Sequence, residues 1–193
     1  MKNYFLTTKD FIIEHKKQFI TGGSVVLGIA AIIVGLALYS YNQPKSPKVV
    51  YEPAVACNLF TLDEAKSFLG DSTINPISVN PTQNGNVADS KCSYSDGRVD
   101  VDNATIIALI VRSGINDQGI AANKSGFAVG KSASGVQVIG NVGDDAFFNT
   151  LNGQLNVLKE STWIIISYGQ AASPTSNSAE DAVKVAQKVL AAS

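Results

Sequence analysis

The hydrophobic pattern of the chain is dominated by one continuous apolar run from Phe19 to Tyr41. Between Val25 and Leu38 the run contains no charged residue, no side-chain amide and no proline. About 20 helical residues, each rising about 1.5 Å, cross the hydrocarbon core of a bilayer and satisfy their own backbone hydrogen bonds there. The pattern therefore predicts a transmembrane helix at 19–41, a tail at 1–18, a linker at 42–56 and a domain at 57–193.

The lysines on either side of this run predict its orientation. The tail contains four lysines, and the linker contains two: Lys2, Lys9, Lys16 and Lys17, then Lys45 and Lys48. Lysine and arginine near a membrane span favour the cytoplasmic side. We therefore expect a single-pass signal anchor in the cell membrane, with a cytoplasmic N-terminus and an extracytoplasmic domain. A cleaved signal peptide is the alternative, but its apolar region is usually shorter and ends in a small-x-small site, where this chain has the bulky stretch Leu38–Tyr41.

Small residues recur along one side of the predicted span, at Ser24, Gly28, Ala31 and Gly35. Spacings of four, three and four residues place them on one helical face, where two helices can approach closely. This face predicts a weak homodimer within the bilayer. The alternative is that these small residues are incidental, since such residues are common in single spans.

The linker contains Pro44, Pro47 and Pro53, which favour an extended chain. After the linker, two patterns of capping residues and apolar residues predict helices. Thr61 and Glu64 form a capping box that predicts a short helix ending near Gly70. Ser178 and Asp181 form a second one, before an apolar stripe that predicts a helix at 179–191. The Ser-, Asn- and Pro-rich stretch 71–86 predicts a loop.

Strand patterns occupy most of the remaining chain. The segment 104–111, Ala-Thr-Ile-Ile-Ala-Leu-Ile-Val, is apolar nearly throughout and predicts a central strand covered on both faces. Asn152-Gly153 predicts a type I′ turn between two paired strands. A weaker helix is expected at 115–124, interrupted by Gly119, and a polar turn at 171–177. Further strands are expected at 91–95, 135–139, 145–150, 154–159 and 163–168. The predicted class is α+β, an antiparallel sheet packed with two or three helices.

Charge and composition exclude several functions. After Tyr41 there are 11 Lys and Arg against 14 Asp and Glu, and no basic stripe of the kind that binds nucleic acid. The one histidine of the chain, His15, lies in the tail, so the domain has no imidazole to serve as a general base. We therefore expect no nucleic-acid partner, no cofactor, no metal site and no catalytic residue.

Two cysteines, Cys57 and Cys92, are the only ones in the chain, and both follow the predicted span. An oxidising compartment favours a disulfide between them, and two buried free thiols are the alternative. Neither cysteine belongs to a Cys-x-x-Cys motif, which argues against a redox or zinc function.

The acidic pair Asp144 and Asp145 follows a glycine-containing turn and is the sharpest candidate for chemistry. Adjacent carboxylates can bind a hard cation or share a proton. The alternative is a turn that begins a strand, with both carboxylates in solvent. Asp100 and Asp102 are a weaker pair, since their spacing does not match a calcium-binding loop.

Several short stretches together resemble a family of envelope lipoproteins of unknown function from bacteria, mainly actinobacteria. They are Ala56–Thr61 with Glu64-Ala65 and Leu69-Gly70, Lys91–Tyr94, Val142–Phe147 and the alanine-rich last helix. The resemblance covers nearly the whole domain and implies an α+β envelope domain with a disulfide and no established activity. This chain differs in its anchor, which is a span where the family has a lipidated cysteine.

These observations together predict a membrane-anchored extracytoplasmic domain of the bacterial cell envelope. Its partners would be the bilayer, through residues 19–41, and an unknown envelope ligand or protein that it binds without catalysis. The first alternative is an accessory or structural subunit of a membrane complex. The second is an envelope hydrolase of an unrecognised type.

Overall fold

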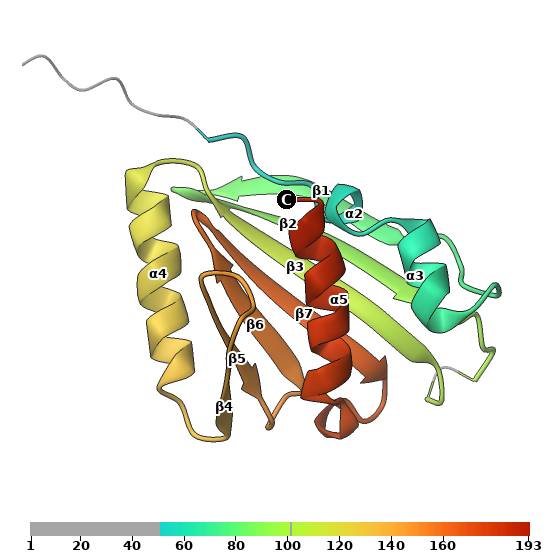
Figure 1. Ribbon diagram of the computed structural model, residues 1–193. Helices are drawn as coiled ribbons and strands as arrows, with labels where there is room; N and C mark the ends of the chain where they lie inside the picture. The colour runs from blue at the N-terminus through green and yellow to red at the C-terminus, as the bar shows by residue number, and fades with distance from the viewer. Residues whose placement is uncertain (1–50, 101) are drawn as a thin grey trace, which may run out of the picture. The chain divides into compact units, whose positions relative to one another are not determined.

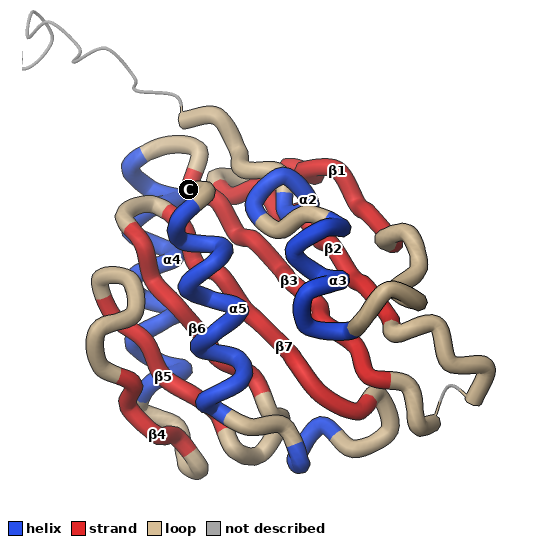
Figure 2. Tube along the Cα trace, turned by 45° about the vertical axis from the view of Figure 1, so that its right-hand side comes forward, coloured by secondary structure: helices blue, strands red, loops and turns tan. Residues whose placement is uncertain are grey.

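A seven-stranded antiparallel sheet with helices on both faces forms the part of the chain that the computed structural model describes, residues 51–100 and 102–193 (Figures 1 and 2). The strands are β1 (Ile77–Asn84), β2 (Val87–Ser95), β3 (Thr105–Gly114), β4 (Val136–Ile139), β5 (Asp145–Asn149), β6 (Gln154–Lys159) and β7 (Thr162–Gln170). The helices are α2 (Ala56–Leu59), α3 (Leu62–Leu69), α4 (Asp117–Lys131) and α5 (Ala179–Ala191), with a 3₁₀ turn η1 (Pro174–Ser176). The predicted α+β class with an antiparallel sheet is confirmed.

Two antiparallel meanders make up the sheet, whose strand order is β1-β2-β3-β7-β6-β5-β4. The first runs from β1 to β3, and the second runs from β4 to β7. Helix α4 connects them, and β7 returns to pair with β3 along nine residues, from Thr105–Gln170 to Ser113–Thr162. Strands far apart in sequence therefore lie side by side at the centre of the sheet.

One face of the sheet carries the main hydrophobic core, beneath α2, α3 and α5 (Figure 2). Alternate residues of each strand point to this face, because side chains of a strand alternate between its two sides. Ile107, Leu109 and Val111 of β3 are buried there, as are Val185 and Val189 of α5. The Ser178 side chain caps α5 by accepting a hydrogen bond from the Asp181 backbone N–H.

The opposite face is covered in part by α4, which packs on β3, β6 and β7. The helix approaches closely through glycines: a Cβ at Gly126 would lie 3.1 Å from the Trp163 ring, and one at Gly130 would lie 3.0 Å from the Phe147 ring. The buried Asn123 amide donates to the carbonyl oxygens of Arg112 and Ser161, at 2.8 and 2.9 Å. These contacts fix α4 over the junction of the two meanders, where β3 pairs with β7.

Three local predictions were wrong. The stretch 71–86 contains strand β1, which lies at the sheet edge and has an irregular register between Val79 and Thr82. Edge strands pair on one side only, so they tolerate proline and polar residues that otherwise indicate a loop. The helix expected at 115–124 with an interruption at Gly119 is α4, which continues through Gly119 to Lys131. Between the paired residues Asn149 and Gln154 there are four residues, and Gly153 has positive φ whereas Asn152 does not, so the turn is not type I′.

Hydrogen bonds attach residues 51–54, which precede α2, to β3 and the residue after it. The Ala54 backbone N–H donates to the Ser113 hydroxyl at 3.0 Å, and the Tyr51 N–H donates to the Ile115 carbonyl oxygen at 3.3 Å. Residues 51–56, expected as the end of the linker, thus lie against β3 and its continuation. The expected tail, span and residues 42–50 of the linker lie outside the described residues. Within the described residues, no helix is long and apolar enough to cross a membrane.

Candidate functional site

The two cysteines meet where α2 contacts the sheet. Cys57 of α2 and Cys92 of β2 form a disulfide, with their Cα atoms 5.1 Å apart and a sequence separation of 35. The predicted bond is confirmed. It connects α2 to a strand in the interior of the sheet, so the surrounding contacts decide whether this is a chemical site or a structural junction.

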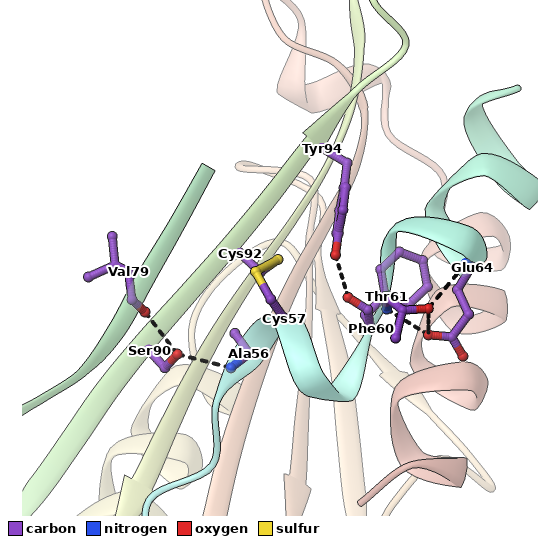
Figure 3. The surroundings of a disulfide bond; sticks show 9 residues. All are labelled: Ala56, Cys57, Phe60, Thr61, Glu64, Val79, Ser90, Cys92 and Tyr94. Atoms are coloured by element: carbon purple, nitrogen blue, oxygen red, sulfur yellow. Dashed lines mark hydrogen bonds between the residues drawn. A yellow bond between two sulfur atoms is a disulfide. The ribbon is translucent and has the colours of Figure 1, made fainter. Parts of the chain in front are cut away.

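Two hydroxyl groups flank the disulfide and attach the same segment to β2 (Figure 3). The fully buried Ser90 hydroxyl accepts from the Ala56 N–H at 2.9 Å and donates to the Val79 carbonyl oxygen at 3.0 Å. The Tyr94 hydroxyl donates to the Phe60 carbonyl oxygen at 2.6 Å. Burial, reinforced by the charge of Glu64, raises the pKa of Tyr94 above its ordinary value. The junction is oxidised and hydrogen-bonded throughout, which gives it a structural function.

The acidic pair Asp144 and Asp145 is divided between two partners. Asp144 accepts from the Glu160 backbone N–H at 2.6 Å and lies 3.6 Å from the Lys159 ammonium. Asp145 begins β5, and its carboxylate accepts from the Lys131 ammonium of α4 at 2.8 Å. The two side chains therefore hold the β6–β7 turn and the end of α4, respectively.

The neighbouring Gly143 explains the rest of this motif. Its φ is +61°, and a Cβ there would lie 2.6 Å from the Leu158 carbonyl oxygen. The glycine-acid sequence thus allows the chain to approach β6 closely where the pairing of β5 with β6 begins. No group of three metal-ligating side chains occurs among residues 51–100 and 102–193. Asp100, of the weaker acidic pair, accepts hydrogen bonds from the Asp102 N–H and the Asn103 amide. Its carboxylate therefore holds the loop before β3 together.

A larger feature lies on the α4 side of the sheet, beyond the helix. Here β1, β2 and the ends of β3 and β7 that lie away from α4 have no helix over them in the part of the chain that the structure describes, and we call this surface the open face (Figures 1 and 2). Ile77 is 72% exposed and Val79 is 43% exposed, while Ile106, Ile110 and Ile165 are half-buried. The segment 104–111 was expected to be covered on both faces, and this expectation was wrong for its outward side chains.

The strand register arranges the open face in rows, because paired residues of antiparallel strands lie on the same side. One row consists of Val79, Lys91, Ile110 and Ile165. The next consists of Ile77, Ser93, Ala108, Ser167 and Gln154. The second row has small side chains at its centre and the aliphatic side chains of Ile106 and Ile110 on either side of Ala108. We call this second row the trough.

The trough ends in a hollow of about 450 Å³ beside Ser167 and Gln154. Its other walls come from the β5–β6 loop and from the segment that follows β7. Leu151, Asn152, Gln170 and Pro174 contribute to these walls. None of the residues that line the hollow carries an ionisable side chain. The hollow can therefore hold an uncharged group with both apolar and hydrogen-bonding atoms.

Two smaller hollows lie elsewhere on the domain. One, of about 350 Å³, lies near the C-terminus between Leu59, Lys159 and Ile164. The other, of about 430 Å³, lies beside Tyr168, Gly169 and Asp181. Burial, and secondarily the charge of Asp181, raises the pKa of Tyr168 there, with Lys184 acting in the opposite direction. In the described ranges, no exposed large hydrophobic side chain lines either of these hollows, whereas exposed Leu151 lines the hollow beside the open face, which is therefore the stronger candidate for binding.

Sequence reasoning did not identify the trough. The alternation of large and small residues at Ile106, Ala108 and Ile110 is visible in the sequence, as is that of Ile165 and Ser167. Only the pairing of β3 with β7 brings these two patterns together. The small-residue face at Ser24, Gly28, Ala31 and Gly35 lies outside the described residues.

Comparisons of the chain with family models, with curated proteins and with solved structures find no match.

Proposed function

We propose that this protein is a membrane-anchored, extracytoplasmic binding domain of the bacterial cell envelope. The apolar run at 19–41 and the lysine excess in the tail support the anchor and its orientation. The Cys57–Cys92 disulfide suits an oxidising compartment. The resemblance to envelope lipoproteins supports the same location.

The main support for a binding function is the open face. An antiparallel sheet in a domain with helices on both sides ordinarily buries its apolar side chains beneath them. Here aliphatic side chains on β1, β3 and β7 remain accessible next to a hollow. Accessible aliphatic side chains beside a cavity are typical of an interaction site.

The chemistry of this face favours binding over catalysis. Lys91 is the one ionisable side chain in the two rows that cross it, Asp89 and Arg112 lie opposite each other in the row beyond, and the described residues contain no histidine. Nucleophilic catalysis requires a nucleophile with a base within hydrogen-bond reach, and acid–base catalysis requires a positioned proton carrier. Hydroxyl groups and aliphatic side chains alone supply binding contacts.

Site-specific crosslinking in cells tests this proposal. A benzophenone amino acid placed at Ile110, on the open face of the full-length protein, should form an adduct upon irradiation. The same amino acid at Ser125, exposed on α4 away from the sheet, is the matched control and should form none. Absence of an adduct at position 110, or equal adducts at both positions, would contradict a binding function for the open face.

A further inference from the structure

We infer that the trough and its hollow bind an extended peptide segment with an acidic group at one end. This inference rests on the proposed binding function of the open face and specifies its ligand. The peptide would lie across the strands, with its uncharged end in the hollow and its acidic end near Lys91. The argument uses the shape, the free polar groups and the charge of this surface.

The shape of the trough suits a chain-like ligand. From Ile77 to Gln154 the trough crosses β1, β2, β3, β7 and β6. Four strand spacings of about 4.8 Å give a length of about 19 Å, which corresponds to roughly six extended residues at about 3.3 Å each. Ser93, Ala108 and Ser167 leave room along its floor, whereas Ile110 and Ile165 form one wall. A compact ligand would fill only the hollow.

Unused hydrogen-bonding groups lie along this path. Within the described part of the chain, three groups make no side-chain hydrogen bond: the Ser93 hydroxyl, the Ser167 hydroxyl and the Gln154 amide nitrogen. The Gln154 amide oxygen accepts a hydrogen bond from the Asn152 amide at 2.9 Å. Hydroxyls both donate and accept, and the amide nitrogen donates. A peptide backbone offers N–H and C=O groups in alternation, so it can satisfy these groups over its whole length.

The side chains that form the trough and line the hollow favour a peptide over other linear ligands. No aromatic side chain lines the hollow or belongs to the trough, so there is no ring face for a sugar to stack on. The aliphatic wall instead suits apolar side chains, which alternate along an extended peptide. Lys91, exposed and without an ion pair among the described residues, lies in the adjoining row and favours a carboxylate at that end.

Selection from a random peptide library tests the inference. The full-length protein in lipid nanodiscs would be exposed to displayed peptides, and the enriched peptides would be measured by fluorescence anisotropy. We expect enrichment of sequences with alternating aliphatic residues and a terminal acidic group. Ser167→Trp, which fills the trough, should weaken their binding about tenfold or more. Ala121→Trp, on the exposed side of α4, is the matched control and should leave binding unchanged.

Charge reversal provides a second variant that does not depend on packing. Lys91→Glu changes an exposed side chain and should shift the selected peptides from acidic to basic ends. No enriched peptide, equal binding by the Ser167→Trp protein, or selective binding of envelope glycan fragments in the same assay would overturn the inference. If crosslinking at position 110 still yields a specific adduct, the binding function stands and only the peptide assignment fails. If neither experiment gives a signal, both proposals fail.

Discussion

The Tyr94 hydroxyl donates a 2.6 Å hydrogen bond to the Phe60 carbonyl oxygen, 34 residues earlier in the chain. The Ala56 N–H and the Ser90 hydroxyl are also 34 residues apart, and the disulfide joins residues 35 apart. Three links at nearly the same spacing therefore align residues 56–60 with β2. They hold α2 and the beginning of α3 over the core.

We predict that Tyr94→Phe lowers the free energy of unfolding by about 1–2 kcal/mol. The change removes the donor and leaves the Phe60 carbonyl oxygen buried without this partner. Urea denaturation followed by circular dichroism measures the difference. Tyr51→Phe, at an exposed position, is the control and should cost less than about 0.5 kcal/mol. Equal losses in both variants would show that the hydrogen bond contributes nothing specific.

Stability should also decline in alkaline solution because of Tyr94. Burial, with the charge of Glu64, raises the pKa of its phenol above the ordinary value of 10.0. The unfolded chain then loses this proton before the folded protein does. The contribution is complete below about pH 10 and is lost as the pH rises through the folded pKa. Unfolding free energies from pH 8 to 11 should fall less steeply for Tyr94→Phe than for the original chain, and parallel curves would refute this.

The disulfide should contribute about 2–4 kcal/mol to stability, because it closes a long loop in the unfolded chain. Cys57→Ser and Cys92→Ser should cost about the same, and the double variant should cost little more, since each change removes the same bond. Melting temperatures of the three variants test this. Mass spectrometry of the unreduced protein after thiol alkylation is the independent check, and two alkylated thiols would contradict the bond.

Gly119→Ala should destabilise the domain by about 1–3 kcal/mol, although alanine ordinarily strengthens a helix. A Cβ at this position would lie 1.9 Å from the Asn86 carbonyl oxygen, so α4 would have to move away from the β1–β2 turn. Gly140→Ala, where nothing lies within 4 Å of the added atom, is the control. A stabilised Gly119→Ala protein in thermal denaturation would mean that α4 does not pack this closely.

Association through the predicted span can be tested separately. Replacing Gly28 and Gly35 by leucine should leave the protein in the membrane, because the segment stays apolar, but should reduce a dimer by separating the helices. Cysteine-independent crosslinking in membranes measures the dimer. Gly22→Leu, a glycine near the end of the run, is the control. Unchanged yield in the double variant would show that the small-residue face is incidental.

Local features of the fold could be predicted from the sequence because neighbouring residues determine them. The capping box of Thr61 and Glu64 begins α3, and Gly70, with φ of +90°, ends it. Ser178 caps α5 one turn before its apolar stripe. With only two cysteines in the chain, the partner of Cys57 could be identified before its position was known.

The open face, by contrast, depends on which strands become neighbours. Nothing local indicates that β7 pairs with β3, or that Ala108 and Ser167 lie opposite each other. The strand β1 was missed because an edge position relaxes the demand for apolar, β-branched residues. Similarly, the sequence identified Asp144 and Asp145 as a pair, whereas the fold turns them toward Glu160 and Lys131. The sequence alone determined where α3 and α5 begin, the disulfide pairing and the apolar run at 19–41, because these depend on residue type and short spacing. The tertiary structure decided the register that makes the trough, because cross-strand pairing depends on contacts between residues far apart in the chain.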